Sequence, residues 1–192
     1  LPRLPGRHQI DNAGVAICAL RKSGILHLER QAVARAMTEV EWPARLQRLT
    51  KGPLFEVIPQ GAELWLDGGH NPAAGRAVAE AMAELAQRDS DGHPRPLILV
   101  SGMLDTKDAG GFFAPFRGLA SHVETVTIPG APASVPAETL ASAASQAGLD
   151  AHAAPSLDEA LQRASLAAGR ATPRILICGS LYLAGHVLSE NG

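Results

Sequence analysis

Short apolar runs alternate with segments of helical periodicity from residue 64 to the end of the chain, and this alternation limits the fold more than any other feature. The apolar runs predict five strands, at 64–66, 97–100, 122–128, 151–153 and 174–178. A helix is expected after each of them, at 72–87, 108–118, 136–147, 156–169 and 181–188. Strands and helices that alternate at this spacing form a mostly parallel sheet flanked by helices. The predicted fold class is therefore α/β.

The first forty residues have a different pattern. Proline and glycine punctuate residues 1–10, which are expected to be extended. Apolar positions then predict a helix at about 11–21 that is buried on much of its surface, and a second helix at 29–40 with one apolar face. Asp11 or Asn12 is suited to the N-cap of the first helix. The chain opens on Leu-Pro-Arg-Leu-Pro-Gly rather than on methionine, so we expect it to be a piece of a longer protein.

A third pattern lies between these two regions. Polar and apolar residues alternate at 45–49 and again at 54–58, on either side of the turn-forming residues 50–53. Alternation with a period of two, interrupted by glycine and proline, is typical of a hairpin. The sequence thus predicts a two-stranded antiparallel piece before the parallel sheet.

Composition and charge exclude several classes of protein. Lys and Arg number 17 against 19 Asp and Glu, with no block of one sign, so nucleic acid is not an expected partner. No apolar run approaches the roughly 20 residues that span a bilayer, and no secretory signal is present, so no membrane partner is expected. Cys18 and Cys178 lie in apolar runs without metal-ligand spacing, which predicts buried thiols and a cytoplasmic protein.

Three of the predicted strands are followed by residues that carry chemistry. Asp67-Gly68-Gly69-His70-Asn71-Pro72 follows the strand at 64–66, the polar segment 101–108 follows the strand at 97–100, and Gly179-Ser180 follows the strand at 174–178. Open parallel sheets bind ligands outside the carboxyl ends of their strands. We therefore expect a site at this edge of the sheet.

The first of these segments is the richest in possible ligand contacts. Asp67 could accept two hydroxyl hydrogens of a ribose, and His70 could donate to a phosphate or a carboxylate. Asn71 is suited to the N-cap of the helix that starts at Pro72. The alternative is that Asp67 only stabilises the turn and that His70 is a solvated loop residue.

The remaining candidates also have simple structural interpretations. Ser180 and Asp108 are suited to helix N-caps, and Lys107 is expected to be solvated. No two histidines have helical metal-ligand spacing, so no metal site is predicted. The chain contains neither a P-loop motif nor the glycine fingerprint of dinucleotide-binding folds, and no complete active site is visible.

Four segments, taken in order, resemble folylpolyglutamate synthase/dihydrofolate synthase, a family of the Mur ligase superfamily. They are His8-Gln9-Ile10-Asp11-Asn12-Ala13, Trp42-Pro43-Ala44-Arg45-Leu46-Gln47, Leu66-Asp67-Gly68-Gly69-His70-Asn71-Pro72 and Cys178-Gly179-Ser180-Leu181-Tyr182. The family usually has alanine where Gly69 stands, and it often has glycine where Ala44 stands. The resemblance implies that residues 1–40 are the terminal helices of a central ATP-binding domain. Residues 41–192 would then form the Rossmann-like C-terminal glutamate ligase domain.

The resemblance also implies an activity. Such an enzyme transfers the γ-phosphate of ATP to a dihydropteroate or folate carboxylate, and the amine of L-glutamate attacks the acyl phosphate. The P-loop and the Mg²⁺ ligands would lie in an N-terminal ATPase domain that is missing from this chain, so the chain alone should be inactive. ATP and Mg²⁺ would serve the full-length enzyme as substrate and metal, with no metal ligand supplied here.

Residue roles follow from the same resemblance. Asn12 would contact the adenine, Arg45 the ATP phosphates and Asp67 the ribose. His70 would be catalytic, and His70 and Ser180 would lie near the glutamate. Two alternatives remain open: a C-terminal domain of a ligase that adds amino acids to cell-wall precursors, and a stand-alone nucleotide- or amino-acid-binding module. A stand-alone module would expose no apolar patch on the helices at 11–40.

Overall fold

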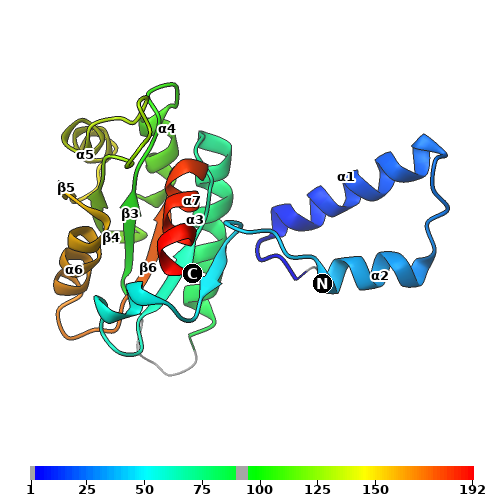
Figure 1. Ribbon diagram of the computed structural model, residues 1–192, viewed down its shortest axis with the longest axis horizontal. Helices are drawn as coiled ribbons and strands as arrows, with labels where there is room; N and C mark the ends of the chain where they lie inside the picture. Colours follow the sequence, from blue (N-terminus) through cyan, green and yellow to red (C-terminus); the bar gives the residue numbers. More distant parts are fainter. Residues whose placement is uncertain (1–2, 90–94) are drawn as a thin grey trace.

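A six-stranded sheet forms the centre of the protein (Figure 1). The computed structural model describes residues 3–89 and 95–192. The strand order is β1-β2-β6-β3-β4-β5. Their bounds are β1 (Gln47–Leu49), β2 (Glu63–Leu66), β3 (Leu97–Ser101), β4 (Ala120–Thr125), β5 (Ala151–Ala153) and β6 (Arg174–Cys178). Neighbouring strands are parallel except for β1, which pairs antiparallel with β2. The α/β prediction is confirmed.

Helices cover both faces of this sheet and divide the core into two clusters. The helices of the sheet domain are α3 (Pro72–Gln87), α4 (Ala109–Phe113), α5 (Ala137–Gln146), α6 (Leu157–Ala167) and α7 (Leu181–Asn191). Side chains of successive strand residues point to opposite faces, so Leu99 packs with α3, α4 and α5 while Ile98 packs with α6 and α7. Both residues are fully buried. The two central strands β3 and β6 are therefore apolar except for Ser101 and Arg174 at their ends, as buried parallel strands commonly are.

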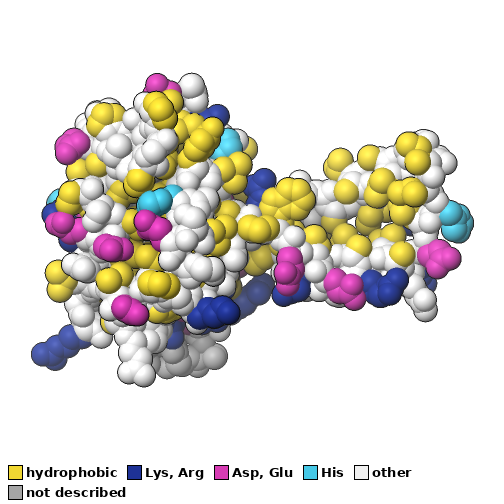
Figure 2. Space-filling model, in the orientation of Figure 1, with side chains coloured by type: hydrophobic (Ala, Val, Ile, Leu, Met, Phe, Trp, Pro, Cys, Tyr) yellow, Lys and Arg dark blue, Asp and Glu magenta, His cyan; other side chains and the backbone are white. Residues whose placement is uncertain are grey.

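A helical hairpin of α1 (Arg7–Ser23) and α2 (Arg30–Glu39) extends away from the sheet domain (Figure 1). Gln9 is the buried residue of α1, and α2 has none. Large apolar side chains are exposed along the hairpin, with Val15 at 70% and Ile25 at 82% (Figure 2). The expectation that the first helix is buried is therefore wrong within this chain, and Cys18 is exposed as well, whereas Cys178 is buried as expected. No helix of the described residues is long and apolar enough to cross a membrane.

The first helix also begins earlier than the sequence pattern predicts. Gly6 has a φ of 100° and makes the turn, and α1 starts at Arg7. No helix breaker separates Gly6 from Asp11, so the helix continues through a segment that was expected to be extended. Asn12 therefore lies inside α1 rather than at its N-cap. The second helix occupies the predicted range, with Glu29 at its N-cap and Val40 at its C-cap.

The predicted antiparallel pairing of residues 45–49 with 54–58 is wrong. β1 pairs instead with β2, and the 3₁₀ helix η1 (Pro53–Glu56) follows β1. The side chain of Asn191, at the end of α7, accepts a hydrogen bond from the Leu54 amide at 3.2 Å and donates one to the Lys51 carbonyl at 2.8 Å. The Asn191 side chain thus satisfies the backbone groups of Lys51 and Leu54 that the predicted strand pairing would have satisfied. The Leu54 side chain is buried in the core.

Two smaller differences concern element ends. The helix predicted at 108–118 is split into α4 and the 3₁₀ helix η2 (Ala114–Phe116), because Pro115 has no amide hydrogen to continue the α-helical bonding. β4 ends at Thr125 rather than at residue 128. Asp108 caps α4, as expected, by accepting a hydrogen bond from the Gly111 amide at 2.9 Å.

Candidate active site

The turn between β2 and α3 has a buried carboxylate at its centre. Asp67 is 4% exposed, and its two oxygens accept hydrogen bonds from the backbone amides of Leu46 at 2.8 Å and Gly69 at 2.7 Å. At the other end of the turn, the Asn71 side chain accepts a hydrogen bond from the Ala74 amide at 2.9 Å and caps α3, as predicted. The turn is therefore held at both ends before any ligand is considered.

The electrostatics of Asp67 show which residues surround it. Burial raises the pKa of this carboxyl, while the amides of Gly69 and Leu46 and the positive charges of Arg45 and His8 act in the opposite direction; the net shift is upward. Arg45 and His8 thus lie near enough for their charge to act on Asp67, although both are distant from it in sequence. Removing the carboxylate would leave two buried amides without a partner, so part of its role is structural.

Arg45 lies between two residues with left-handed backbone conformations. Ala44 has a φ of 56° and Leu46 a φ of 44°, and conformations of this kind cost non-glycine residues about 1 kcal/mol or more each. Contacts to the neighbouring turn hold them: the Ala44 carbonyl accepts from the Gly68 amide at 2.8 Å, and Leu46 donates to Asp67. A left-handed Ala44 explains why glycine suits this position. The exposed Arg45 is thereby fixed next to the Asp67 turn.

A pocket of about 460 Å³ lies where the helical hairpin meets the sheet domain, and Arg45 is one of its lining residues. Two more arginines, Arg3 and Arg48, and two tryptophans, Trp42 and Trp65, also line it. Arg3 pairs with Glu41, another lining residue, at 2.7 Å, and Arg48 pairs with Glu63 at 3.3 Å, whereas Arg45 has no ion pair within the described residues. A guanidinium without an ion pair beside aromatic side chains is suited to an anionic ligand with a flat apolar part. The pocket is thus compatible with a nucleotide.

His70 and Ser180 lie together in a second, smaller pocket. The Gly179 amide donates to the Gly69 carbonyl at 3.0 Å, which joins the loop after β6 to the loop after β2. The pocket measures about 120 Å³ and is lined by His70, Leu104, Lys107, Gly179, Ser180, Leu181 and Tyr182. The Ser180 hydroxyl also caps α7 by accepting from the Tyr182 amide at 3.0 Å. Two predicted residues from distant parts of the chain therefore share one pocket.

Glycine at position 179 is required by the close approach of these loops. Its φ is 105°, and a Cβ atom there would lie 2.6 Å from Ser101 Oγ and 2.8 Å from the Gly102 carbonyl oxygen. His70 is positioned by its own turn, since its Nδ1 donates to the Gly68 carbonyl at 3.0 Å. A carbonyl can only accept, so Nδ1 carries the proton and Nε2 is available to a ligand.

Asn12 and Lys107 depart most from their predicted places. Asn12 donates to Gln9 Oε1 at 3.2 Å on the exposed surface of α1 and lines neither of the two pockets. Lys107, expected to be solvated, is half-buried in the wall of the His70 pocket. Its amide donates to the Leu104 carbonyl at 3.1 Å, in the turn that follows β3. Its position at the end of β3 was the available sequence signal.

Comparison with known proteins identifies the family. Residues 55–181 match the family described as "Mur ligase, glutamate ligase domain". The chain belongs to this family. The folylpolyglutamate synthase of Lacticaseibacillus casei is 28% identical over 189 residues, which are 96% of this chain and 38% of that protein. The chain therefore spans less than half the length of this relative.

Solved structures agree with this assignment. A Mycobacterium tuberculosis folylpolyglutamate synthase, solved with ADP and AMPPCP, superposes with a TM-score of 0.79 at 25% identity and covers 98% of this chain and 41% of that one. A bifunctional folylpolyglutamate synthase/dihydrofolate synthase with Mn, AMPPNP and L-glutamate bound gives 0.75 at 25% identity, over 98% of this chain and 40% of that one. The Rossmann-like glutamate ligase domain expected from the sequence is therefore confirmed. The division at residue 40 stays a prediction.

Proposed function

We propose that this glutamate ligase domain supplies ATP- and glutamate-facing residues to an enzyme that joins L-glutamate to dihydropteroate or folate through an acyl phosphate. The gathering of Arg45, Asp67, His70 and Ser180 at the carboxyl ends of β2 and β6 carries the proposal. The solved relatives that hold nucleotides and L-glutamate support it. The proposal includes a contact between Asn12 and the adenine, which would need a ligand that reaches α1.

The chemistry explains why such residues are useful. A carboxylate is a poor electrophile until ATP converts it to an acyl phosphate, and the amine must then be held close to the reacting carbon. Arg45 presents a permanent positive charge that suits phosphoryl oxygens. When neutral, His70 Nε2 can accept a proton from the glutamate ammonium, and when protonated it can donate to a carboxylate or phosphoryl oxygen.

Residues suited to Mg²⁺ are not found at this site among those the structure describes. The carboxylate of the site, Asp67, already accepts two backbone hydrogen bonds and is buried. Mg²⁺ prefers carboxylates and phosphates that leave room for several waters. We infer that the Mg²⁺ that accompanies ATP would be held by another domain, and no step is assigned to it here.

The exposed hairpin separates this proposal from a stand-alone binding module. Several large apolar side chains on α1 and the loop after it are exposed to solvent, among them Val15 and Ile25. Figure 2 shows apolar side chains along the surface of the hairpin. A module that works alone would bury them. We propose that the hairpin packs against an ATPase domain of the same cytoplasmic protein, which would also bring the P-loop. The cell-wall alternative shares the family, but the relatives named above favour the folate substrates.

The chain by itself is expected to lack ligase activity. The described residues contain no phosphate-binding loop and no Mg²⁺ site, so ATP cannot be activated for attack. The measurement is glutamate-dependent phosphate release by the purified 192-residue chain with ATP, Mg²⁺ and dihydropteroate or a folate. Release clearly above that of a protein-free control would contradict the proposed division of labour.

Nucleotide binding by the chain alone is expected to be weak. Arg45 and Asp67 provide only part of a site, and the backbone amides that normally cradle the phosphates are missing. Titration calorimetry with ATP should therefore show a dissociation constant well above the micromolar range. Arg45→Ala should weaken any measurable binding further, whereas Arg170→Ala, an exposed arginine outside both pockets, should not. Micromolar binding, or equal effects of the two substitutions, would refute this assignment of Arg45.

A further inference from the structure

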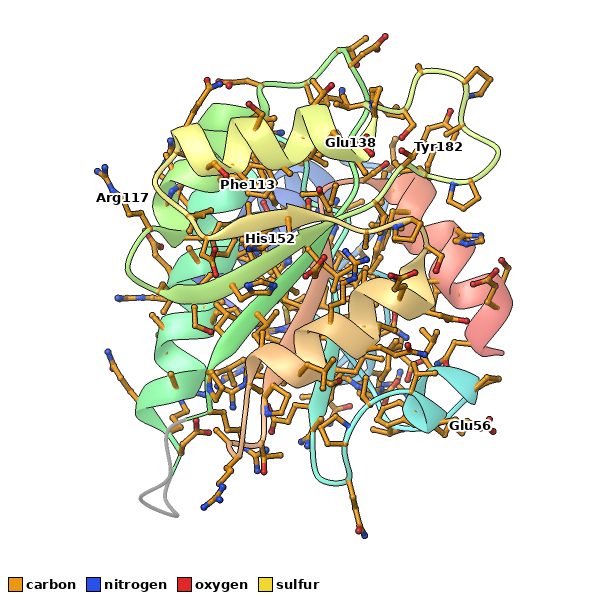
Figure 3. All side chains as sticks on the ribbon, turned by 90° about the vertical axis from the view of Figure 1, so that its left-hand side faces the viewer. Glu56, Phe113, Arg117, Glu138, His152 and Tyr182 are labelled. Atoms are coloured by element: carbon orange, nitrogen blue, oxygen red, sulfur yellow. The ribbon has the colours of Figure 1, made fainter. Side chains whose placement is uncertain are left out.

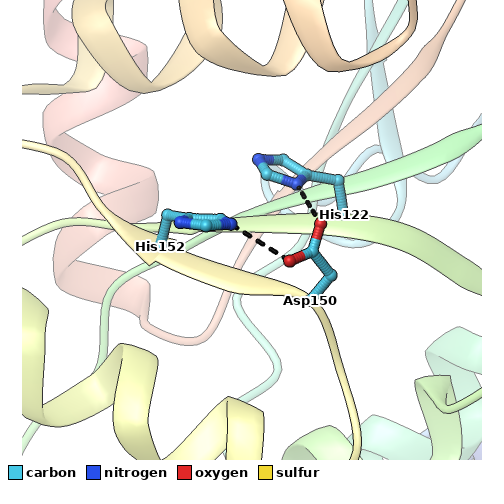
Figure 4. Close-up of side chains that lie close together, drawn as sticks. All are labelled: His122, Asp150 and His152. Atoms are coloured by element: carbon cyan, nitrogen blue, oxygen red, sulfur yellow. Dashed lines mark hydrogen bonds and ion pairs between the residues drawn. The ribbon is translucent and has the colours of Figure 1, made fainter.

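Two histidines and an aspartate, His122, His152 and Asp150, converge near the β5 edge of the sheet, away from the candidate active site. Figure 3 labels His152 on this edge strand. β4 and β5 pair in parallel with Glu124 opposite His152, which places His122 opposite Asp150. These four residues alternate along their strands, so their side chains share one face. His122 Nδ1 lies 3.0 Å from Asp150 Oδ2, and His152 Nε2 lies 3.0 Å from Asp150 Oδ1 (Figure 4).

The hydrogen bonds of His122 are unusual because carboxylates face both of its ring nitrogens. Nε2 lies 2.8 Å from Glu124 Oε1, and Nδ1 faces Asp150. A neutral imidazole has a single N–H and can donate to only one of them. Glu124 is 2% exposed, and its Oε2 has no hydrogen-bond partner within residues 3–89 and 95–192. The cluster therefore offers more carboxylate acceptors than imidazole N–H donors, and a bound cation would balance the excess of negative charge.

We propose that His122, His152 and Asp150 bind a divalent transition-metal ion of the Zn²⁺ class. One ligand atom from each residue lies within 4.8 Å of the others, near enough for a single ion to reach all three. Imidazole nitrogen and carboxylate oxygen are ordinary zinc ligands. The ion would replace the protons that His122 Nδ1 and His152 Nε2 now share with Asp150. His152 and Asp150 are exposed, so water can complete the coordination.

Glu124 fits this site as a positioning residue. With a metal on Nδ1, His122 is neutral and its Nε2–H donates to Glu124, which removes the conflict between two acceptors. A carboxylate that receives the second N–H of a metal-bound histidine fixes both the tautomer and the ring orientation. The role of the buried Glu124 is therefore to hold His122 in the tautomer and orientation that present Nδ1 to the metal. The site shares no residue with the two pockets of the candidate active site.

Zinc titration of the 192-residue chain, prepared without an affinity tag and stripped of metal, tests the proposal. We expect saturable binding of one Zn²⁺ per chain and a rise in melting temperature, because the metal binds the folded form. Loss of a contact at a metal site commonly weakens metal binding by about tenfold or more. We therefore expect Glu124→Gln to weaken zinc binding about tenfold and His152→Gln, which removes a ligand, at least tenfold. His27→Gln removes an exposed histidine of the hairpin and should leave binding unchanged.

The opposite results would overturn the site. His152 is exposed and Glu124→Gln keeps the shape of the side chain, so both variants should fold, which circular dichroism can verify. Binding that is equal in the wild type and His152→Gln would place the zinc elsewhere. No saturable binding by the folded wild type would leave His122 as a protonated bridge between Glu124 and Asp150. An effect of His27→Gln as large as that of His152→Gln would also contradict the proposal.

Discussion

In a ligase that contains this domain, His70→Ala is expected to lower kcat about 10²-fold, the loss typical of one preorganised polar contact to a reacting group. The histidine is held by its bond to the Gly68 carbonyl, and it lines the pocket that contains Ser180 and Lys107. If it acts on charge that develops during phosphoryl transfer or glutamate attack, kcat falls while KM for ATP changes little. Steady-state kinetics with each substrate varied in turn measures this.

Two further variants separate this role from a structural one. His70→Gln keeps a polar group near the position of Nε2 and should recover part of the lost activity. His186→Ala removes a histidine from α7 that pairs with Glu190 at 3.3 Å and lines neither pocket, so kcat should stay near the wild-type value. If His70 is only a turn residue, His70→Ala will lower the melting temperature and leave the kinetics of the folded enzyme unchanged.

Local signals were sufficient for much of the fold. Strands β2, β3 and β6 were predicted because they are short apolar runs, and the caps at Asn71, Asp108 and Ser180 were predicted because each polar side chain precedes a helical pattern. The sheet edge that carries the candidate site followed from the rule that parallel strands align their carboxyl ends. These features depend on a few neighbouring residues, so periodicity and turn chemistry describe them.

The features that the sequence did not predict depend on residues far apart in the chain. η1 replaces a predicted strand because Asn191 supplies its hydrogen bonds across 137 residues of sequence. Lys107 enters the pocket wall because two loops pack together, and the His122 cluster exists only through the register of β4 against β5. Helical metal-ligand spacing does not describe the cluster, because its members alternate along two neighbouring strands, β4 and β5. Such contacts require the tertiary structure.

Arg174→Ala is expected to destabilise the domain by about 3–5 kcal/mol, a large part of the 5–15 kcal/mol that stabilises a typical domain. Arg174 is 3% exposed at the start of β6. Its Nε donates to Glu63 at 2.6 Å and its Nη2 to Asp89 at 2.9 Å. The alanine variant would leave the poorly hydrated Asp89 carboxylate without its cation and Glu63 with only the half-exposed Arg48, 3.3 Å away. Chemical denaturation of both proteins measures the difference.

The exposed pair of Arg88 and Glu84 provides the matched control. Their nearest charged atoms are 3.8 Å apart, and the Arg88 side chain is 75% exposed. Exposed pairs of this kind contribute at most about 1 kcal/mol, so Arg88→Ala should change the free energy of unfolding little. Similar losses of unfolding free energy in Arg88→Ala and Arg174→Ala would show that a buried carboxylate depends on its cation no more than an exposed one does in this protein.

Acid should reduce the difference in the free energy of unfolding between Arg174→Ala and the wild type. Burial alone would raise the pKa of Glu63, but hydrogen bonds from Arg174 and Trp65 and the charges of Arg174 and Arg48 hold it below the ordinary glutamate value. A folded-state pKa below the unfolded one stabilises the protein above the unfolded pKa, and this contribution is lost progressively as the pH falls below the ordinary glutamate value of about 4.3. Without Arg174, the pKa of Glu63 is expected to rise, because the hydrogen bond and the charge of Arg174 no longer oppose the effect of burial. Protonation of Glu63 in acid then removes a charge that the variant pairs less well. The stability gap should therefore narrow in acid, and a gap that is constant from neutral pH to acid would show that Glu63 is not coupled to Arg174.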